Sequence, residues 1–350
     1  MKTRPIGYYV HHQGAGHWQR ANLLADALDR PVTLIGTLDG IDTGATRHPC
    51  VPLPDDRLAG GDGQDFEGLD GESDRPHAFH YVPLRAPAVR TRMARIAAWI
   101  AEADPVLMIV DVSVEVALFA RLLSVPTVVV RLAGTRTDIP HLEAFRSAER
   151  LLAPFPAELE SEGTPGWVRA KTFHAGFLGL ESRRGREEDG SILVIYGSGG
   201  EGGSCHDLAA AAAAVPDRDW HVLGPVHGEA ALPPNLHLHG WVTEIGPRLA
   251  AASLVVGTGG DGVVAAVAAG AKRFVCIPEP RPFEEQVAKA RRLDALGAAI
   301  LCEAWPGAEA WPGVIRAGLA LDPARIAGLV DPDSVRRTAD EIRTLVDRLT

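Results

Sequence analysis

The sequence predicts an α/β protein of two domains, each with a parallel sheet. Two observations lead to this prediction. A length of 350 residues exceeds what one ordinary core takes up, so two domains of roughly 170 residues each are the natural arrangement. Short apolar runs alternate with helical patterns along the chain, which is typical of parallel sheets covered by helices.

The first domain is predicted to span residues 1–179. Its expected strands are the apolar runs at 6–10, 32–35, 106–110 and 125–130, with helices at 17–28, 88–103 and 114–123. The run Val106–Val110 is unbroken and apolar, as in a strand buried on both faces. Residues 55–80 are rich in Gly and Asp, which is typical of either a functional loop or a disordered segment.

Residues 180–190 are charged and lack apolar periodicity, so we expect a linker there. The alternation of strands and helices then restarts over a second domain, residues 191–330. Its expected strands are 192–196, 220–223, 254–256, 273–277 and 299–301. Residues 331–350 are predicted to form a charged C-terminal helix that could pack on either domain.

Composition excludes several classes of function. The net charge of −10 argues against a nucleic-acid partner, which would require a basic face. The N-terminus does not resemble a secretory signal, and no apolar run approaches the ~18 residues that span a bilayer. Four scattered cysteines are typical of reduced thiols in a cytoplasmic protein. The histidines lack zinc-site spacing, so no metal site is predicted.

The first candidate site follows the strand at 6–10. Gly14 and Gly16 allow a sharp turn, and His17 opens the next helix at the edge where open sheets bind ligands. Asp111 ends the strand at 106–110 and has two interpretations. It could cap the helix that begins near Ser113, or it could orient His17 as the partner of a general base.

Two glycine-rich turns are candidate phosphate-binding sites. The first includes Gly197, Ser198 and Gly199, and could equally be a flexible turn. The second precedes a helix and places Gly259, Gly260, Asp261 and Gly262 at its start, where unpaired N–H groups and the helix dipole suit a diphosphate. Glu285 and Gln286 begin the following helix and offer hydrogen-bonding groups for sugar hydroxyls. Asp261 and Glu285 are also ordinary acids for a helix start.

These motifs resemble a known family. The stretch Gly257–Ala298, with its glycine turn, Ala-rich helix, Pro-rich loop and Glu-Gln pair, resembles the C-terminal domain of glycosyltransferase family 28. That family includes the cell-wall N-acetylglucosaminyltransferase, and the stretch is also similar to small-molecule UDP-glycosyltransferases. Gly14–His17 looks like the family's N-terminal G-x-G-H loop, and Trp241 and Val242 stand where the family holds the nucleobase.

The resemblance implies a GT-B fold, in which two Rossmann-like domains face a central cleft. It also implies an inverting glycosyltransferase with His17 as the base, Asp111 as its orienting acid, and a UDP- or TDP-type sugar donor. The glycine turns, Trp241, Val242 and the Glu-Gln pair would bind this donor. No metal ion or other cofactor would be required. The acceptor stays unidentified, and both a small molecule and a lipid-linked one are compatible with the sequence.

The chain departs from the family at several positions. Ala265 stands where the family carries a ribose-binding Glu, and Gly257 and Gly262 provide no side chains for phosphate. Two alternatives therefore stay open: a degenerate nucleotide-sugar-binding or partner protein, and a nucleotide-sugar epimerase.

Residues 55–95 and 131–145 are expected to form the acceptor side of the cleft. Within them Arg90, Arg92 and Arg95 are either a solvated helix face or a site for an anionic acceptor at a membrane surface.

Overall fold

A computed structural model of the chain describes residues 3–11, 15–56, 76–180, 188–197 and 200–350. Within these ranges, seven strands form a parallel sheet in the order β3-β2-β1-β4-β5-β6-β7. The strands are β1 (Ile6–Val10), β2 (Val32–Gly36), β3 (Cys50–Pro52), β4 (Leu107–Asp111), β5 (Thr127–Val130), β6 (Arg150–Ala153) and β7 (Thr172–His174). The central strands β1 and β4 are buried along their whole length, which explains their unbroken apolar character.

The second half of the chain repeats this architecture. Six strands of the described ranges form a parallel sheet in the order β12-β10-β8-β13-β14-β15. They are β8 (Ile192–Ile195), β10 (Trp220–Leu223), β12 (Leu236–Leu238), β13 (Leu254–Gly257), β14 (Phe274–Cys276) and β15 (Ile300–Leu301); β9 (Gly203–Ser204) and β11 (Val226–His227) pair separately. Counted within its own half, this order is 3-2-1-4-5-6, the order of a Rossmann fold, and the first six strands of the first sheet follow it too.

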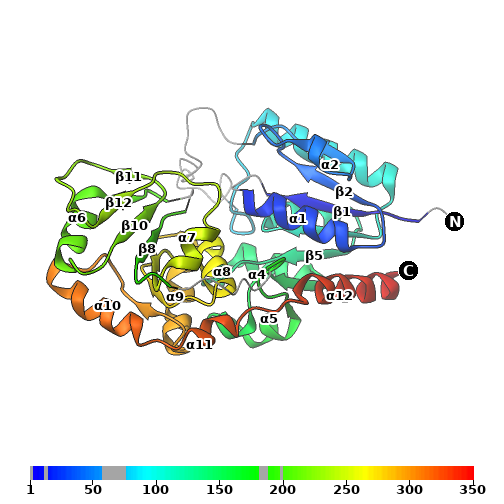
Figure 1. Cartoon of the computed structure of the whole chain (residues 1–350). Coiled ribbons are helices and arrows are strands. Elements are labelled where there is room, and N and C mark those ends of the chain that lie inside the picture. Colours follow the sequence, from blue (N-terminus) through cyan, green and yellow to red (C-terminus); the bar gives the residue numbers. More distant parts are fainter. Residues whose placement is uncertain (1–2, 12–14, 57–75, 181–187, 198–199) are drawn as a thin grey trace.

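Helices cover both faces of each sheet (Figure 1). Those of the first half are α1 (Ala15–Ala27), α2 (Pro87–Ala103), α3 (Val114–Leu122), α4 (Ile139–Ser147) and α5 (Gly166–Lys171). Those of the second half are α6 (Cys205–Ala214), α7 (Gly246–Ala251), α8 (Asp261–Ala269), α9 (Glu285–Ala295), α10 (Trp311–Leu319) and α11 (Pro323–Ala327). One core lies between the first sheet and α1, and another lies between that sheet and α2–α4.

The C-terminal helix α12 (Ser334–Leu349) returns to the first half of the chain (Figure 1). Its apolar residues Ala339, Ile342 and Val346 belong to the same core as Leu24 of α1. The sequence left both domains open as partners for this helix. The structure shows that it completes the first one.

The structure extends and corrects the predictions in detail. Strands β3, β6, β7 and β12 were not predicted from the sequence. Arg92 is buried, contrary to the expectation of a solvated helix face. It donates to the hydroxyls of Thr37 and Tyr9, each at 2.6 Å, and to the carbonyl of Pro54. These hydrogen bonds hold α2 against the first sheet.

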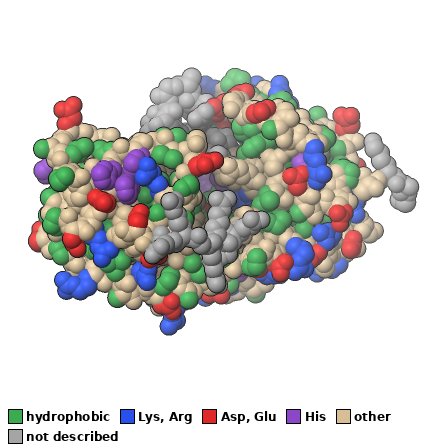
Figure 2. Space-filling model, in the orientation of Figure 1, with side chains coloured by type: hydrophobic (Ala, Val, Ile, Leu, Met, Phe, Trp, Pro, Cys, Tyr) green, Lys and Arg blue, Asp and Glu red, His purple; other side chains and the backbone are tan. Residues whose placement is uncertain are grey.

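Surface charges are mixed in sign. Figure 2 shows Lys and Arg side chains interspersed with Asp and Glu over both halves of the molecule. Among the described residues, no helix is both long enough and apolar enough to span a bilayer.

Candidate active site

Each sheet has one natural place for a ligand. In an open parallel sheet, a crevice forms at the carboxyl ends of the strands where the strand order reverses. That point lies between β1 and β4 in the first sheet, and between β8 and β13 in the second. His17 follows β1 and Asp111 ends β4, whereas Gly197 follows β8 and the glycine turn 259–262 follows β13. The residues singled out from the sequence therefore gather at the two crevices.

His17, Asp111 and Arg20 are in direct contact at the first crevice. Nδ1 of His17 lies 2.9 Å from Oδ2 of Asp111, and one guanidinium nitrogen of Arg20 donates to both carboxylate oxygens, each at 2.9 Å. That nitrogen also lies 2.8 Å from Nδ1 of His17. The carboxylate is a stronger acceptor than a neutral ring nitrogen, so Nδ1 of His17 carries the proton and donates it to Asp111.

This arrangement leaves Nε2 of His17 with its lone pair, and none of the described residues hydrogen-bonds it. Burial raises the pKa of the Asp111 carboxyl, but Arg20 and His17 together hold it below its usual value. Asp111 is therefore ionised at neutral pH. It does not cap α3, because Ser113 is the N-cap and accepts from the backbone N–H of Val116 at 3.3 Å.

At the second crevice, Gln286 and Lys289 of α9 brace the loop that leads into α8. Oε1 of Gln286 accepts from the backbone N–H groups of Gly259 at 3.0 Å and of Glu279 at 2.9 Å. The buried amine of Lys289 donates to the carbonyl of Gly259 at 3.1 Å and forms an ion pair with Asp261. The Gln286 side chain is buried, and its two hydrogen bonds to backbone N–H groups hold the loop in place.

The two crevices face each other across the halves of the chain. Glu285 accepts from Arg136 of the first half at 3.1 Å, and the backbone N–H of Thr135 donates to the carbonyl of Phe283 at 2.7 Å. Burial alone would raise the pKa of Asp261, but Lys289 holds it below its usual value. Arg20 and His17 of the opposite half contribute to this lowering. The charges of the second crevice therefore lie within electrostatic range of His17.

A cavity lies at each crevice. In the second half a cavity of ≈ 440 Å³ is lined by Tyr196, Thr258 and Glu279, at the ends of β8, β13 and β14. In the first half a cavity of ≈ 240 Å³ is lined by His11 and His80 and also by Phe283 from the second half. The rings of His11 and His17 are 5.3 Å apart, so this smaller cavity lies beside the His17–Asp111 pair.

The other predicted residues have varied environments. Gly14, Ser198 and Gly199 lie outside the described residues. Trp241 is largely exposed and Val242 packs against the core of the second half. Gly16 lies in the first turn of α1, Gly260 is the N-cap of α8, and Gly262 is exposed in the first turn of α8.

Sequence reasoning missed three cations of the site: Arg20, Arg136 and Lys289. A signal existed for two of them. Arg20 follows His17 by three residues, and Lys289 follows Glu285 by four, so each pair shares a helix face. Arg136 lies in a loop, and no spacing connects it to Glu285.

No protein-family model matches this sequence, and no curated protein matches it. Solved structures match over nearly its whole length. The glycotransferase of kitacinnamycin has a TM-score of 0.71 at 16% identity, with 100% of each chain covered. MurG of Acinetobacter baumannii has a TM-score of 0.66 at 16% identity, covering 97% of this chain and 99% of that chain. The rhamnosyltransferase SpnG, complexed with thymidine diphosphate, has a TM-score of 0.64 at 18% identity, covering 98% and 99%.

These structures are GT-B glycosyltransferases with two Rossmann-like domains. This chain has the GT-B fold. The predicted fold class is thereby confirmed, and both Rossmann-like sheets of the GT-B architecture have a counterpart in the observed strand orders. At 16–18% identity the likeness establishes the fold.

Proposed function

We propose that this GT-B protein is a glycosyltransferase that moves a sugar from a nucleotide-diphosphate sugar to an acceptor hydroxyl. The observation that carries the proposal is the His17–Asp111 contact at the first crevice, opposite Asp261 and Glu285 at the starts of α8 and α9. A histidine whose Nδ1–H is held by an ionised carboxylate presents a basic Nε2, which is the arrangement of a general base.

In the proposed step, Nε2 of His17 takes the proton of the acceptor hydroxyl as its oxygen attacks the anomeric carbon. The bond from that carbon to the diphosphate oxygen breaks, and the nucleoside diphosphate leaves. Attack from the face opposite the leaving group inverts the anomeric configuration. Asp111 stabilises the imidazolium that forms, and Arg20 holds Asp111 in its ionised state.

We assign the donor to the second half, residues 191–330, and the acceptor to residues 1–179 together with helix 331–350. The ≈ 440 Å³ cavity is within the range of small-molecule sites. The first N–H groups of α8 have no partner inside the helix and suit a diphosphate. The solved structures of SpnG and VinC contain thymidine diphosphate and DTDP, which favours a TDP- or UDP-type donor. The step as written uses no cofactor.

One observation favours a second candidate, a protein that binds a nucleotide sugar without turning it over. Ala265 packs against the core of the second half and has no polar group, so its side chain cannot hydrogen-bond a ribose. An epimerase is the third candidate, because Arg20, Arg136 and Glu285 supply the additional charged groups that such a reaction would use.

The test begins with calorimetric titration of the protein with UDP, TDP and GDP, and with their common sugars. The donor identified in this way is then incubated with a panel of phenolic and sugar acceptors. We expect a glycosylated product of inverted configuration by NMR. His17→Ala should abolish transfer while donor affinity stays unchanged, and the exposed His206→Ala serves as the control.

Three other results would count against the proposal. Binding of a nucleotide with no turnover of its sugar by the unmodified protein would favour the binding protein. Conversion of the nucleotide sugar to an isomer in the absence of acceptor would favour the epimerase. No response to any nucleotide would contradict a donor site in the second half.

A further inference from the structure

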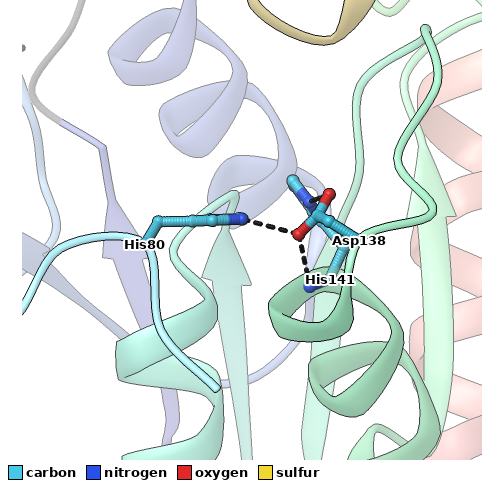
Figure 3. A group of neighbouring side chains, drawn as sticks. All are labelled: His80, Asp138 and His141. Atoms are coloured by element: carbon cyan, nitrogen blue, oxygen red, sulfur yellow. Dashed lines mark hydrogen bonds and ion pairs between the residues drawn. The ribbon is translucent and has the colours of Figure 1, made fainter. Parts of the chain in front are cut away.

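A second histidine–aspartate contact lies at the ≈ 240 Å³ cavity of the first half. Nε2 of His80 lies 2.7 Å from Oδ1 of Asp138, and Nδ1 of His141 lies 2.7 Å from Oδ2 of the same carboxylate (Figure 3). His80 belongs to the loop before α2, whereas Asp138 and His141 begin α4. Both histidines line the cavity. The proposed sugar transfer uses none of the three residues.

Two carboxylates fix the position of His80. Oε1 of Glu115, on α3, accepts from the backbone N–H groups of His80 at 2.8 Å and of Tyr81 at 3.0 Å. Asp138 holds the His80 side chain and is itself fixed as the N-cap of α4, where it accepts from the backbone N–H of His141 at 3.3 Å. His80 is therefore anchored to two helices, to α3 through its backbone N–H and to α4 through its ring.

The hydrogen-bond partners determine which ring nitrogens carry protons. Arg136 can only donate, and its guanidinium nitrogen lies 3.1 Å from Nε2 of His141. Nε2 of His141 therefore accepts, and its Nδ1 carries the proton donated to Asp138. Burial lowers the pKa of His141, and Arg136 also lowers it, which keeps this ring neutral.

The same reasoning fixes His80. Asp138 can only accept, because interactions with His141 and His80 hold its pKa below the usual value against the effect of burial. Nε2 of His80 therefore carries a proton, and in the neutral ring Nδ1 keeps the lone pair. In the part of the chain that the structure describes, no group hydrogen-bonds this Nδ1.

The three side chains also have the donor types of a divalent-cation site, with ligand atoms within 4.8 Å of one another. A cation on Nδ1 of His141 would move the ring proton to Nε2, directly opposite an N–H of Arg136. Metal-bound histidines almost always donate that N–H to an acceptor. Arg136 is buried and held by the carbonyls of Leu132 and Ala133, so it cannot turn away. The proton arrangement therefore favours an ion-free site.

We propose that His80, oriented by Asp138, binds the acceptor by accepting a hydrogen bond at Nδ1 from one of its O–H or N–H groups. The inference rests on the proposed function in one respect, because it takes this cavity to be the acceptor site. His80 is then a specificity-determining residue. It recognises a polar group other than the hydroxyl that His17 deprotonates.

The cavity also indicates the class of acceptor. Its volume of ≈ 240 Å³ is below the roughly 300–1,000 Å³ of drug-sized ligand sites, so only a small molecule would fit. Val89, Met93 and Val116 line it as apolar walls, and the aromatic ring of Phe283 lies 5.5 Å from that of His80. A compact ring compound with at least two hydroxyl or N–H groups matches this combination.

The test is histidine-selective ¹⁵N NMR of the full chain, titrated with phenol and, separately, with anisole. Anisole has the same ring but no O–H donor. The resonance of His80 is identified by its absence in His80→Phe, which keeps the aromatic contacts with His141 and Phe283. We expect His80 to be protonated at Nε2 only. Phenol should shift its Nδ1 resonance and bind about 3- to 10-fold more tightly than anisole.

The His80→Phe variant should bind phenol and anisole equally, whereas His77→Ala, exposed in the same loop, should retain the preference. Equal binding of the two probes to the unmodified protein, or no binding of phenol, would overturn the proposal. So would a Co²⁺ absorption band that disappears in His80→Phe, because it would assign the site to a metal. Nucleotide titration of the same samples tests the donor site independently, so failure of one proposal is distinguishable from failure of the other.

Discussion

The contact between Asp111 and Arg20 is expected to stabilise the fold through its pairing, and a double-mutant cycle tests this directly. The Asp111 side chain is fully buried and that of Arg20 is 12% exposed. Asp111→Asn leaves the guanidinium of Arg20 buried without a carboxylate, and Arg20→Met leaves Asp111 with His17 alone. Breaking one side of a buried ion pair destabilises by about 3–5 kcal/mol. Each single variant should therefore unfold about 6–20 °C lower.

The double variant should lose much less than the sum of the single losses. Neutral side chains of similar size in place of both charges are often tolerated, because the desolvation of the charges is removed as well. We expect a coupling energy of about 2–4 kcal/mol between the two positions. The matched control is the exposed pair Arg47–Asp26, where the same changes should alter stability by less than about 1 kcal/mol.

Thermal and urea-induced unfolding, followed by circular dichroism, measure these differences. Strict additivity at Asp111 and Arg20 would refute the reasoning, and so would single losses no larger than those at the exposed pair. The cycle also separates stability from chemistry. If His17 is the base, transfer should fall about 10²–10⁴-fold in Asp111→Asn even at temperatures where the variant is fully folded.

Three further outcomes are expected. Glu285→Gln should not lower stability at pH 7. Burial raises the pKa of Glu285, so the stability that this carboxyl contributes is present below the unfolded pKa of about 4.3 and is lost as pH rises through the folded pKa. Midpoints of urea unfolding at pH 4 and pH 7 check this. Gly134→Ala should destabilise the fold by about 2 kcal/mol or more, because Gly134 has φ +100° and an added Cβ would lie 2.4 Å from the carbonyl oxygen of Phe283. The control is Gly163→Ala, whose added Cβ meets no atom within 4 Å, in the same unfolding measurement. Asp138→Asn should lose less stability in acid than the unmodified protein. The lowered pKa of Asp138 gives stability that is present above the unfolded pKa of about 3.9 and is lost as pH falls through the folded pKa. Acid unfolding curves of the two proteins test this.

The sequence predicted the strands that lie deep in each sheet and missed several at the edges. The strands β1, β4 and β13 are continuous apolar runs because helices cover both of their faces. At the edge of the first sheet, β3 and β7 are three residues long and contain Pro52 and His174. Such short segments have no periodicity to distinguish them from loops, and only pairing with a neighbouring strand identifies them.

The position of α12 could not be predicted for a different reason. Alternating apolar and charged residues indicate that a helix has a face to bury, but they contain no information about its partner. The buried face of α12 fits the same core as α1, more than 300 residues away in the chain. Contacts of that range depend on the whole fold.

The contacts between site residues also divide into those that the sequence could predict and those that depend on the whole fold. His17 and Asp111 each follow a buried strand, and the carboxyl ends of parallel strands meet at one edge, so their proximity could be expected from the sequence. His80 lies in the loop before α2 and Asp138 is the N-cap of α4, and their contact depends on how that loop packs on α4. No spacing in the sequence encodes that packing.

The Glu-Gln pair shows why a motif alone does not define the roles of its residues. Consecutive residues on a helix project about 100° apart, so neighbours at a helix start point in different directions. Glu285 contacts Arg136 across the cleft, whereas Gln286 turns inward and holds the backbone of Gly259. Glu285 therefore faces the first half of the chain, and Gln286 holds the loop of the proposed donor site. Substitution of Gln286 should thus alter the donor site through the shape of that loop.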